Sequence, residues 1–414
     1  MKRSPMKRAR KHEFLFAILA AALITTVGCS GGTGGITPGG GGGGGSTTSN
    51  TQTITVNTGP TGNYVDGAFT SVTICVPGST TSCQTIDGIL VDTGSSGLRI
   101  LASALTLSLP QQKSASGDSI VECLPFVDGV TWGPVQTADM TIAGEQAKSL
   151  PIQVIGSSSF SNVPAACTSF GVPEDTVESF GANGVLGVGN FAQDCGDGCT
   201  VSGGANPGLY FTCRANNCNV TTESIANQVA NPVIFFASDN NGVLIDIPGV
   251  TGEETTVSGS LIFGIGTQSD NAVGSATVYS LDPDIGNFTT KFNNVTYSDA
   301  AFLDTGSNGI YFLDSNTTGI PVCTDATFWY CPNATQNLSA TNEAFSNGAT
   351  GTVNFSVANA GTITANINDA AVNGLAGPDS ATFDWGLPFF FGRKVFTAIE
   401  GSNTPVGQGP YVAY

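Results

Sequence analysis

The chain has 414 residues, with 13 basic and 31 acidic side chains, a net charge of −18 and one histidine, His12. Nucleic acid is not expected as a partner, because phosphate binding needs a basic surface. A lone histidine near the N-terminus also argues against Ser-His-Asp and Cys-His mechanisms and removes the commonest zinc ligand.

Residues 1–29 have the features of a lipoprotein-type signal peptide. A start with six Lys and Arg side chains precedes Phe14–Val27, an apolar run too short to span a bilayer comfortably. The ending Thr-Val-Gly-Cys resembles the bacterial lipoprotein cleavage site, so we expect a lipid on Cys29, although Thr26 stands where Leu is preferred. Ser30 favours the outer membrane. We therefore expect a lipid-anchored protein of the bacterial cell envelope, with secretion as the alternative.

Residues 30–50 form the next segment and include the glycine run 39–45. Such a composition cannot build a core, so we interpret it as a flexible tether rather than as an N-terminus without a role. Loss of the signal peptide removes six basic side chains and one acidic side chain. Seven basic and 30 acidic side chains remain, which gives a net charge of −23. This charge suits acidic surroundings, or it serves solubility alone.

The remaining chain predicts an all-β fold, because short runs rich in Val, Ile, Thr and Phe are separated by Gly, Asn, Asp and Pro. The clearest predicted strands are Thr53–Asn57, Tyr64–Val76, Thr85–Val91, Val233–Ala237, Val243–Ile247 and Leu261–Gly264. Helical periodicity is scarce. The exception is Thr222–Val229, where a threonine can cap the first turn and Glu223 suits it.

Ten cysteines follow Cys29, and an even number in an exported chain predicts disulfides. They are Cys75, Cys83, Cys123, Cys167, Cys195, Cys199, Cys213, Cys218, Cys323 and Cys331. The spacing of Cys75 with Cys83 and of Cys323 with Cys331 suits local bridges, while the other pairings stay open. The two pairs between residues 195 and 218 also fit a four-thiolate zinc site, but oxidised pairs are the default outside the cytoplasm, so no metal is expected.

Two segments of the chain share one design. Residues 89–100 read Ile-Leu-Val-Asp-Thr-Gly-Ser-Ser-Gly-Leu-Arg-Ile, and residues 301–312 read Ala-Phe-Leu-Asp-Thr-Gly-Ser-Asn-Gly-Ile-Tyr-Phe. Each places one carboxylate, Asp92 or Asp304, in a glycine turn after an apolar strand. One Asp-Thr-Gly is a weak signal in this composition, but two with matching flanks are much harder to obtain by chance. If the turns meet, the two carboxyls share a proton.

These motifs resemble the pepsin-like aspartic peptidases, in which each of two lobes contributes one Asp-Thr-Gly to a single cleft. The resemblance implies a bilobal double β-barrel with few short helices, an N-terminal lobe over residues 51–264 and a C-terminal lobe over residues 265–414. It also implies that a strand passes behind each catalytic turn. The segments 184–189 and 385–389 fit this role, although Asp384 stands where an apolar residue is expected.

The resemblance assigns roles to the residues around both carboxylates. Asp92 and Asp304 would act jointly as acid and base. Support for this dyad would come from Thr93, Gly94 and Ser95 in the first turn and from Thr305, Gly306 and Ser307 in the second. On their own, these Thr and Ser residues would be read as turn caps.

The chain departs from the family pattern in two further places. The family closes a hairpin with a Tyr near its tip over the substrate, but the corresponding stretch 126–133 has none. Phe126 and Trp132 are therefore candidates for an apolar lid, and ordinary core packing is the alternative for each. Arg99 stands where the family commonly has Trp.

The sequence thus predicts an exported, membrane-tethered aspartic endopeptidase that works as a monomer on peptide or protein substrates and needs no cofactor. The alternative is a non-catalytic peptide-binding or surface lipoprotein that retains the pepsin-like fold. Retention of Thr and Ser beside both aspartates favours the enzyme.

Overall fold

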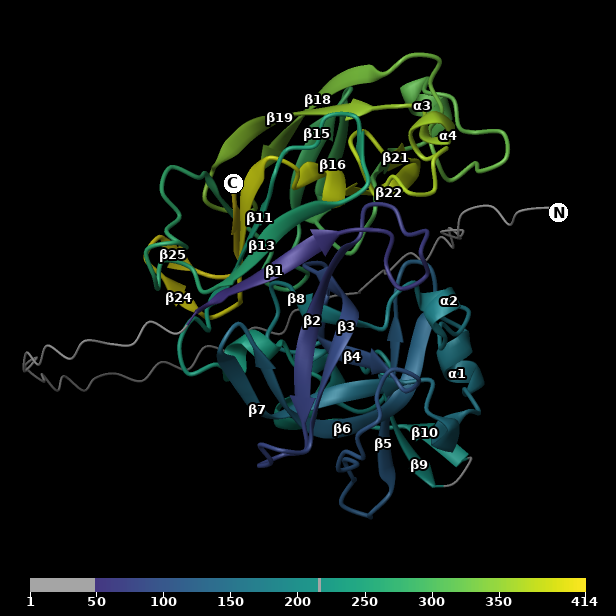
Figure 1. The fold of residues 1–414 in the computed structure, drawn as a ribbon, viewed down its shortest axis with the longest axis vertical. Helices are drawn as coiled ribbons and strands as arrows, with labels where there is room; N and C mark the ends of the chain where they lie inside the picture. Colours follow the sequence, from purple (N-terminus) through teal and green to yellow (C-terminus); the bar gives the residue numbers. More distant parts are fainter. Residues whose placement is uncertain (1–48, 215–216) are drawn as a thin grey trace, which may run out of the picture.

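A computed structural model describes residues 49–214 and 217–414 and arranges them in two β-rich lobes (Figure 1). The predicted signal peptide, Cys29 and nearly all of the predicted tether lie outside the described residues, so these assignments stay predictions. Asn50, the last residue of the predicted tether, already belongs to the fold. Its Nδ2 donates to the Phe263 carbonyl at 2.9 Å.

The N-terminal lobe contains a closed barrel. Its strands, in spatial order, are β2 (Ala68–Cys75), β3 (Cys83–Asp92), β8 (Gly184–Val188), β4 (Ser96–Leu101), β7 (Glu145–Ile155) and β6 (Val130–Ile142). Closure comes from β6, which pairs with both β7 and β2. Strands β4 and β8 are buried along their whole length. Their apolar residues fill the barrel, which explains why these segments read as continuous hydrophobic runs.

Two extensions continue the sheet beyond the barrel. One consists of β5 (Ser119–Pro125), β9 (Tyr210–Arg214) and β10 (Asn217–Val220); the other consists of β1 (Thr51–Val56), β13 (Val257–Phe263), β11 (Gly242–Ile247), β23 (Arg393–Ala398), β26 (Tyr411–Ala413) and β14 (Val278–Ser280). Figure 1 shows β1, β13 and β11 between the two lobes. Because β23 and β26 come from the C-terminal end, both halves of the sequence build this connecting sheet.

The C-terminal lobe has a seven-stranded sheet of its own. It consists of β19 (Thr350–Val357), β18 (Gln336–Glu343), β15 (Phe288–Phe292), β16 (Val295–Leu303), β22 (Asp379–Trp385), β17 (Ile310–Leu313) and β21 (Ala376–Gly377). Its core is aromatic: Phe312, Phe383 and Trp385 are fully buried. The Phe383 and Trp385 ring centroids lie 4.4 Å apart. Two small pairs complete the strands, β12 (Glu253–Glu254) with β20 (Ala371–Val372) and β24 (Asn403–Thr404) with β25 (Gly407–Gln408).

Helices are short throughout the described chain, so the predicted all-β class is confirmed. The α-helices are α1 (Ala165–Thr168), α2 (Val177–Phe180), α3 (Ser315–Thr318) and α4 (Ala360–Ile363); the 3₁₀ turns are η1 (Ser158–Phe160), η2 (Gly196–Cys199), η3 (Ile225–Asn227), η4 (Pro232–Phe235) and η5 (Leu387–Phe389). None of the helices in the described ranges has the length and hydropathy needed to cross a membrane.

Two local predictions were wrong. The predicted strand Val233–Ala237 is largely the turn η4, because Asn231 caps it by accepting the Val233 N–H and Pro232 occupies its first position. The predicted helix Thr222–Val229 is reduced to η3. The backbone is extended at Gln228, whose side chain donates to the carbonyls of Gly196 and Glu223, so tertiary contacts override local propensity.

All ten predicted cysteines form disulfides. The pairs are Cys75–Cys83, Cys123–Cys167, Cys195–Cys199, Cys213–Cys218 and Cys323–Cys331. The two predicted local bridges are confirmed, and the zinc alternative is wrong because all four thiols it requires are bonded in pairs. Five disulfides fit a protein of the cell envelope or the extracellular space.

Replacement of both Cys123 and Cys167 by alanine should lower the free energy of unfolding by about 4 kcal/mol, because this bridge joins residues 44 positions apart. The same replacement of Cys213 and Cys218, which are five positions apart, should cost only about 2 kcal/mol. Urea unfolding followed by tryptophan fluorescence measures both. Equal losses would contradict the argument from loop length.

Candidate active site

Two threonines join the Asp-Thr-Gly turns at the junction of the lobes. The Thr93 N–H donates to Thr305 Oγ1 at 3.1 Å, and the Thr305 N–H donates to Thr93 Oγ1 at 3.0 Å. Each hydroxyl in turn donates across the junction, Thr93 to the Leu303 carbonyl at 3.2 Å and Thr305 to the Val91 carbonyl at 2.8 Å. Both threonines are buried. This reciprocal set fixes the position of one turn relative to the other.

Each aspartate accepts hydrogen bonds from the glycine two residues later and from the serine three residues later. The bonds are Gly94 N to Asp92 Oδ1 at 2.7 Å, Ser95 Oγ to Asp92 Oδ2 at 2.5 Å, Gly306 N to Asp304 Oδ1 at 2.7 Å and Ser307 Oγ to Asp304 Oδ2 at 2.7 Å. The glycine and the serine that the sequence analysis placed beside each carboxyl therefore bond it, while the two threonines bond across the junction instead. The two halves of the site are nearly identical, as their matching motifs suggested.

The two carboxyl groups are immediate neighbours. A Cβ on Gly94 would lie 2.7 Å from Asp304 Cγ, and a Cβ on Gly306 would lie 2.8 Å from Asp92 Cγ, so only glycine fits at either position. Asp92 is 5% exposed, and Asp304 is more open. Burial, the charge of Asp304 and the hydrogen bond with Asp304 raise the pKa of Asp92 well above its usual value. Carboxyls this close cannot both ionise comfortably.

A strand passes behind each turn, as predicted. Asp92 pairs with Gly187 in the parallel ladder of β3 and β8, and a Cβ on Gly187 would lie 2.8 Å from the Ser96 backbone. In the other lobe the Asp304 N–H donates to the Trp385 carbonyl at 3.1 Å. A Cβ on Gly386 would meet the backbone even more closely. Glycine is required at both places because the Asp-Thr-Gly turn packs directly on the strand.

The hairpin of β5 and β6 occupies the place of the expected lid. Trp132 is only 3% exposed, and its indole N–H donates to the Phe160 carbonyl at 2.7 Å, so it is a core residue, which is the alternative that the sequence analysis gave beside an apolar lid. Phe126 lies at the tip, half-buried, with its ring 6.1 Å from that of Phe180. Beside it, Val127 is 78% exposed and is the most accessible large apolar side chain described.

This hairpin is tied to the lobe on several sides. Strand β5 pairs with β9 as well as with β6, and the Cys123–Cys167 disulfide joins it to α1. Near the tip, the Val130 N–H donates to Val172 and the Val130 carbonyl accepts from Glu174, each at 2.9 Å. The hairpin is thus part of a continuous sheet and not a free hairpin, so we expect limited movement.

Arg99 is fully buried and holds a network of charges behind the hairpin. Its guanidinium donates to Glu122 at 2.7 Å, to Asp194 at 2.8 Å and to the Ser96 carbonyl at 2.8 Å. The Tyr210 hydroxyl also donates to Asp194, at 2.8 Å. Burial and the nearby charge of Glu122 raise the pKa of Asp194 well above its usual value, while Arg99 opposes this shift. The network connects β4 to the lid strand β5.

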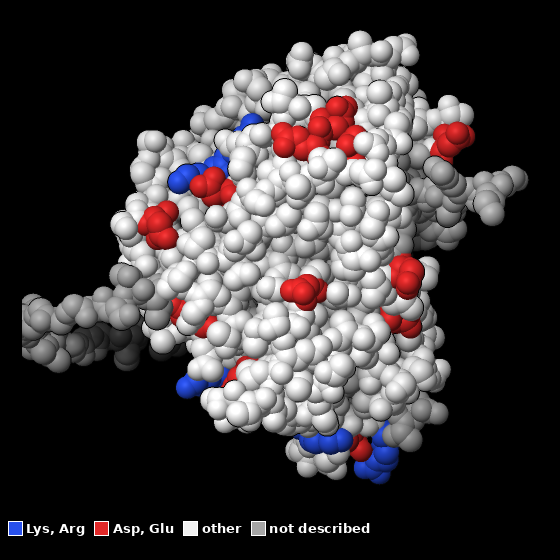
Figure 2. Space-filling model, viewed as in Figure 1, with Lys and Arg blue, Asp and Glu red and all other residues white. Residues whose placement is uncertain are grey.

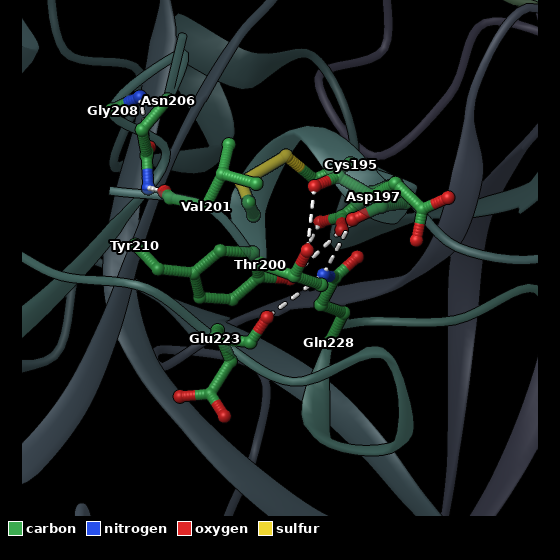
Figure 3. The surroundings of a disulfide bond; sticks show 12 residues. Cys195, Asp197, Thr200, Val201, Asn206, Gly208, Tyr210, Glu223 and Gln228 are labelled. Atoms are coloured by element: carbon green, nitrogen blue, oxygen red, sulfur yellow. Dashed lines mark hydrogen bonds between the residues drawn. A yellow bond between two sulfur atoms is a disulfide. The ribbon is translucent and has the colours of Figure 1, made fainter. Parts of the chain in front are cut away.

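The segment after Asp194 is held by the Cys195–Cys199 disulfide (Figure 3). Gln228 Nε2 donates to the carbonyls of Gly196 at 2.8 Å and Glu223 at 3.1 Å. This arrangement keeps Asp194 facing Arg99. Sequence reasoning noticed Arg99 only as a departure and missed its partners, because nothing in the local sequence links residues 122, 194 and 210.

Sequence reasoning also missed two tyrosines, Tyr64 near Asp304 and Tyr311 near Asp384. Burial and then the charges of Asp128 and Asp304 raise the pKa of the Tyr64 hydroxyl. Burial, and then the nearby charges of Asp384, Tyr64 and Asp128, raise the pKa of the Tyr311 hydroxyl. The lid tip, which contains Asp128, therefore lies near residues of both lobes. No group of three or more His, Cys, Asp or Glu side chains able to hold a metal occurs in the described ranges.

Comparison with known families places the chain in a family of unknown function. Residues 46–414 match the model of a family described as "Protein of unknown function (DUF3443)". The chain belongs to this family. No curated protein matches it.

Comparison with solved structures supports the bilobal fold. The chain is similar to the aspartic proteinase from Irpex lacteus, whose crystal structure matches with a TM-score of 0.50 at 15% sequence identity. The match covers 88% of this chain and 96% of that chain. At this identity, the similarity shows a pepsin-like fold and nothing about catalysis.

The folded protein should be more stable at pH 5 than at pH 8. Burial raises the pKa of Asp66, Asp92, Asp194 and Asp384 well above the usual value. The folded state therefore keeps protons that the unfolded chain releases above about pH 4, and the free energy of unfolding falls as pH rises, by about 1.4 kcal/mol per group for each unit of upward shift. Thermal unfolding by circular dichroism between pH 4 and 8 measures this trend.

The variant Asp66→Asn should flatten this pH dependence, because Asp66 is fully buried and its Oδ2 has no hydrogen-bond partner. Asp87→Asn is the matched control, because Asp87 is exposed on β3. A stability that rises from pH 5 to pH 8 in the unmodified protein would show that these carboxyls are ionised in the folded state.

Proposed function

We propose that this protein is an exported aspartic endopeptidase, held at the membrane by a lipid on Cys29. The observation that carries the proposal is the joining of Asp92 and Asp304 into one hydrogen-bonded pair by the reciprocal bonds of Thr93 and Thr305. Two adjacent carboxyls with matching hydrogen-bond partners, where burial and the neighbouring carboxyl raise the pKa of Asp92, are an arrangement typical of acid-base catalysis.

In this proposal the pair hydrolyses a peptide bond with an activated water molecule. The ionised member takes the proton of the water as it attacks the carbonyl carbon, and the protonated member gives its proton to the carbonyl oxygen. Neighbouring carboxyls that share one proton act together, so acid and base are not assigned to individual residues. Ser95 and Ser307 hold the outer carboxyl oxygens, and the threonine pair keeps both groups in place during the reaction.

The surroundings of the pair are consistent with work outside the cytoplasm and without a cofactor. Five disulfides suit an oxidising compartment, and residues 30–48 would serve as a spacer between membrane and enzyme. Acidic side chains are spread over both lobes on the face shown in Figure 2, while basic ones lie near its edges. We infer a monomer whose partner is a peptide or protein substrate.

One observation favours the alternative of a non-catalytic peptide-binding lipoprotein. The lid hairpin, residues 119–142, contains no tyrosine, and Trp132 is buried in the core. The lid therefore lacks the phenolic hydrogen bond that the family resemblance implies over the substrate. A pair of aspartates in an inactive protein would still be able to bind an extended peptide.

Digestion of a denatured protein substrate between pH 3 and 7 tests the proposal on the mature chain. Asp92→Asn and Asp304→Asn should each lower the rate by at least about 100-fold, because each removes a proton donor or acceptor from the pair. Asp87→Asn, on the same strand as Asp92, is the control and should keep the rate.

A transition-state-like aspartic peptidase inhibitor separates the two functions, because it binds a correctly formed pair tightly. Inhibition of the unmodified protein would support the peptidase. If neither the unmodified protein nor the variants digest the substrate but the inhibitor binds tightly, the protein is a binding protein. If there is neither digestion nor inhibitor binding, the proposed site is rejected.

A further inference from the structure

Asp384 is a third carboxyl group beside the pair. It lies on β22 between Phe383 and Trp385, both of which point into the aromatic core and are fully buried. Alternation along a strand sends Asp384 to the opposite face. Its neighbours across the ladders are Phe302 on β16 and Tyr311 on β17, and both are partly exposed. Asp384 therefore belongs to the non-core face of the sheet, next to the turn that holds Asp304.

The Asp384 side chain lacks the partners that a buried carboxyl needs. It is 5% exposed, and its Oδ1 has no hydrogen-bond partner. Ser307 lies close enough to bond it, but the Ser307 hydroxyl already donates to Asp304 Oδ2 at 2.7 Å and has only one proton to give. Burial and the charge of Asp304 raise the pKa of Asp384 well above its usual value. A buried acceptor without a hydrogen-bond partner lowers the stability of the folded state by about 1–3 kcal/mol.

No basic side chain of the described chain is available to Asp384. Six of the seven have partners elsewhere: Arg99 with Glu122 and Asp194, Lys113 with Ser119, Arg214 with Asp118, Lys291 with Glu343, Arg393 with the carbonyls of Phe389 and Asn354, and Lys394 with Asp246. The seventh, Lys148, is exposed on β7. A cation next to Asp384 would have to come from another molecule.

The groups around Asp384 favour a positive charge. The charges of Asp384, Asp128 and Asp66 all act on the Tyr311 hydroxyl, and the Asp66 Oδ2 is a second buried oxygen without a partner. Asp379 and both members of the pair are further negative neighbours of Asp384. Tyr311 adds an aromatic surface, on which ammonium and guanidinium groups bind favourably.

We propose that Asp384 binds the ammonium or guanidinium group of a lysine or arginine side chain in a peptide lying across Asp92 and Asp304. The position of the peptide rests on the proposed function, but the preference for a basic side chain does not require cleavage. An incoming cation would pair with the unsatisfied oxygen and offset the repulsion among the neighbouring carboxylates. A neutral side chain of the same length would leave both costs in place.

The test compares peptides that differ in one residue. In a neutral fluorogenic peptide that the protein cleaves, each position is replaced in turn by lysine, arginine or norleucine, and kcat/KM is measured at pH 6. At one position near the cleaved bond, lysine or arginine should be preferred over norleucine by about tenfold or more, as expected for a hydrogen bond to a charged group. Asp384→Asn should reduce this ratio to about one.

Asp379→Asn is the matched control on the same strand. It also removes a negative charge near Asp384, but the Asp379 oxygens already accept from the Ala381 N–H and the Thr382 hydroxyl, each at 2.8 Å. The preference for lysine should survive in this variant. A ratio that falls equally in both variants would show that general negative charge, and not Asp384, sets the preference, and the proposal would fail.

Two further results would overturn the proposal. If the unmodified protein cleaves every peptide with no preference for a basic residue, the peptidase proposal stands and the role of Asp384 does not. Alternatively, Asp384→Asn could slow cleavage of basic and neutral peptides by the same factor, which would make Asp384 a residue that only positions Asp304.

Binding keeps the test decisive if the protein cleaves nothing. Fluorescence anisotropy of the same labelled peptides with the Asp92→Asn variant measures the preference directly. Tighter binding of the lysine peptide, lost on adding Asp384→Asn, would support the inference even though the peptidase proposal had failed. Equal binding of the lysine and norleucine peptides would reject it.

Discussion

The site depends on the reciprocal bonds between Thr93 and Thr305. Each threonine uses its N–H and its hydroxyl across the junction of the lobes, so four hydrogen bonds join two turns that lie more than 200 residues apart in sequence. Because these groups are buried, they have no water to replace a lost partner. The same contacts that hold the lobes together therefore place Asp92 next to Asp304, and the fold cannot form this junction without forming the pair.

The two halves of the site are equivalent at the aspartates and differ in charge seven residues later. There the N-terminal lobe has Arg99, buried with two carboxyls behind the lid, and the C-terminal lobe has Tyr311, partly exposed beside Asp384. In the first half, the buried charge network around Arg99 holds β5 in place. In the second half, an aromatic ring and a carboxyl oxygen without a partner lie next to the pair. This asymmetry is the reason why the proposed contact with a basic side chain is assigned to the second half.

Buried carboxyl groups recur throughout the junction. Asp66 receives only the Val372 N–H, at 2.8 Å, and Asp194 and Asp384 also sit where burial disfavours their charge. With seven basic side chains in the described chain, few cations exist to neutralise them. Without a neighbouring cation, burial favours the neutral form of these groups, and a bound cation would favour the ionised form.

The sequence by itself determined the all-β class, the two aspartates with their Thr, Gly and Ser neighbours, the strands behind them and two local disulfides. These features depend on short-range patterns: alternation, turn residues and cysteines eight positions apart. Only the tertiary structure decided the burial of Trp132, the partners of Arg99, the turn at Pro232–Phe235 and the isolation of Asp384. Each of these depends on which distant segments pack together, and local residue patterns do not encode the partner that a buried side chain will meet.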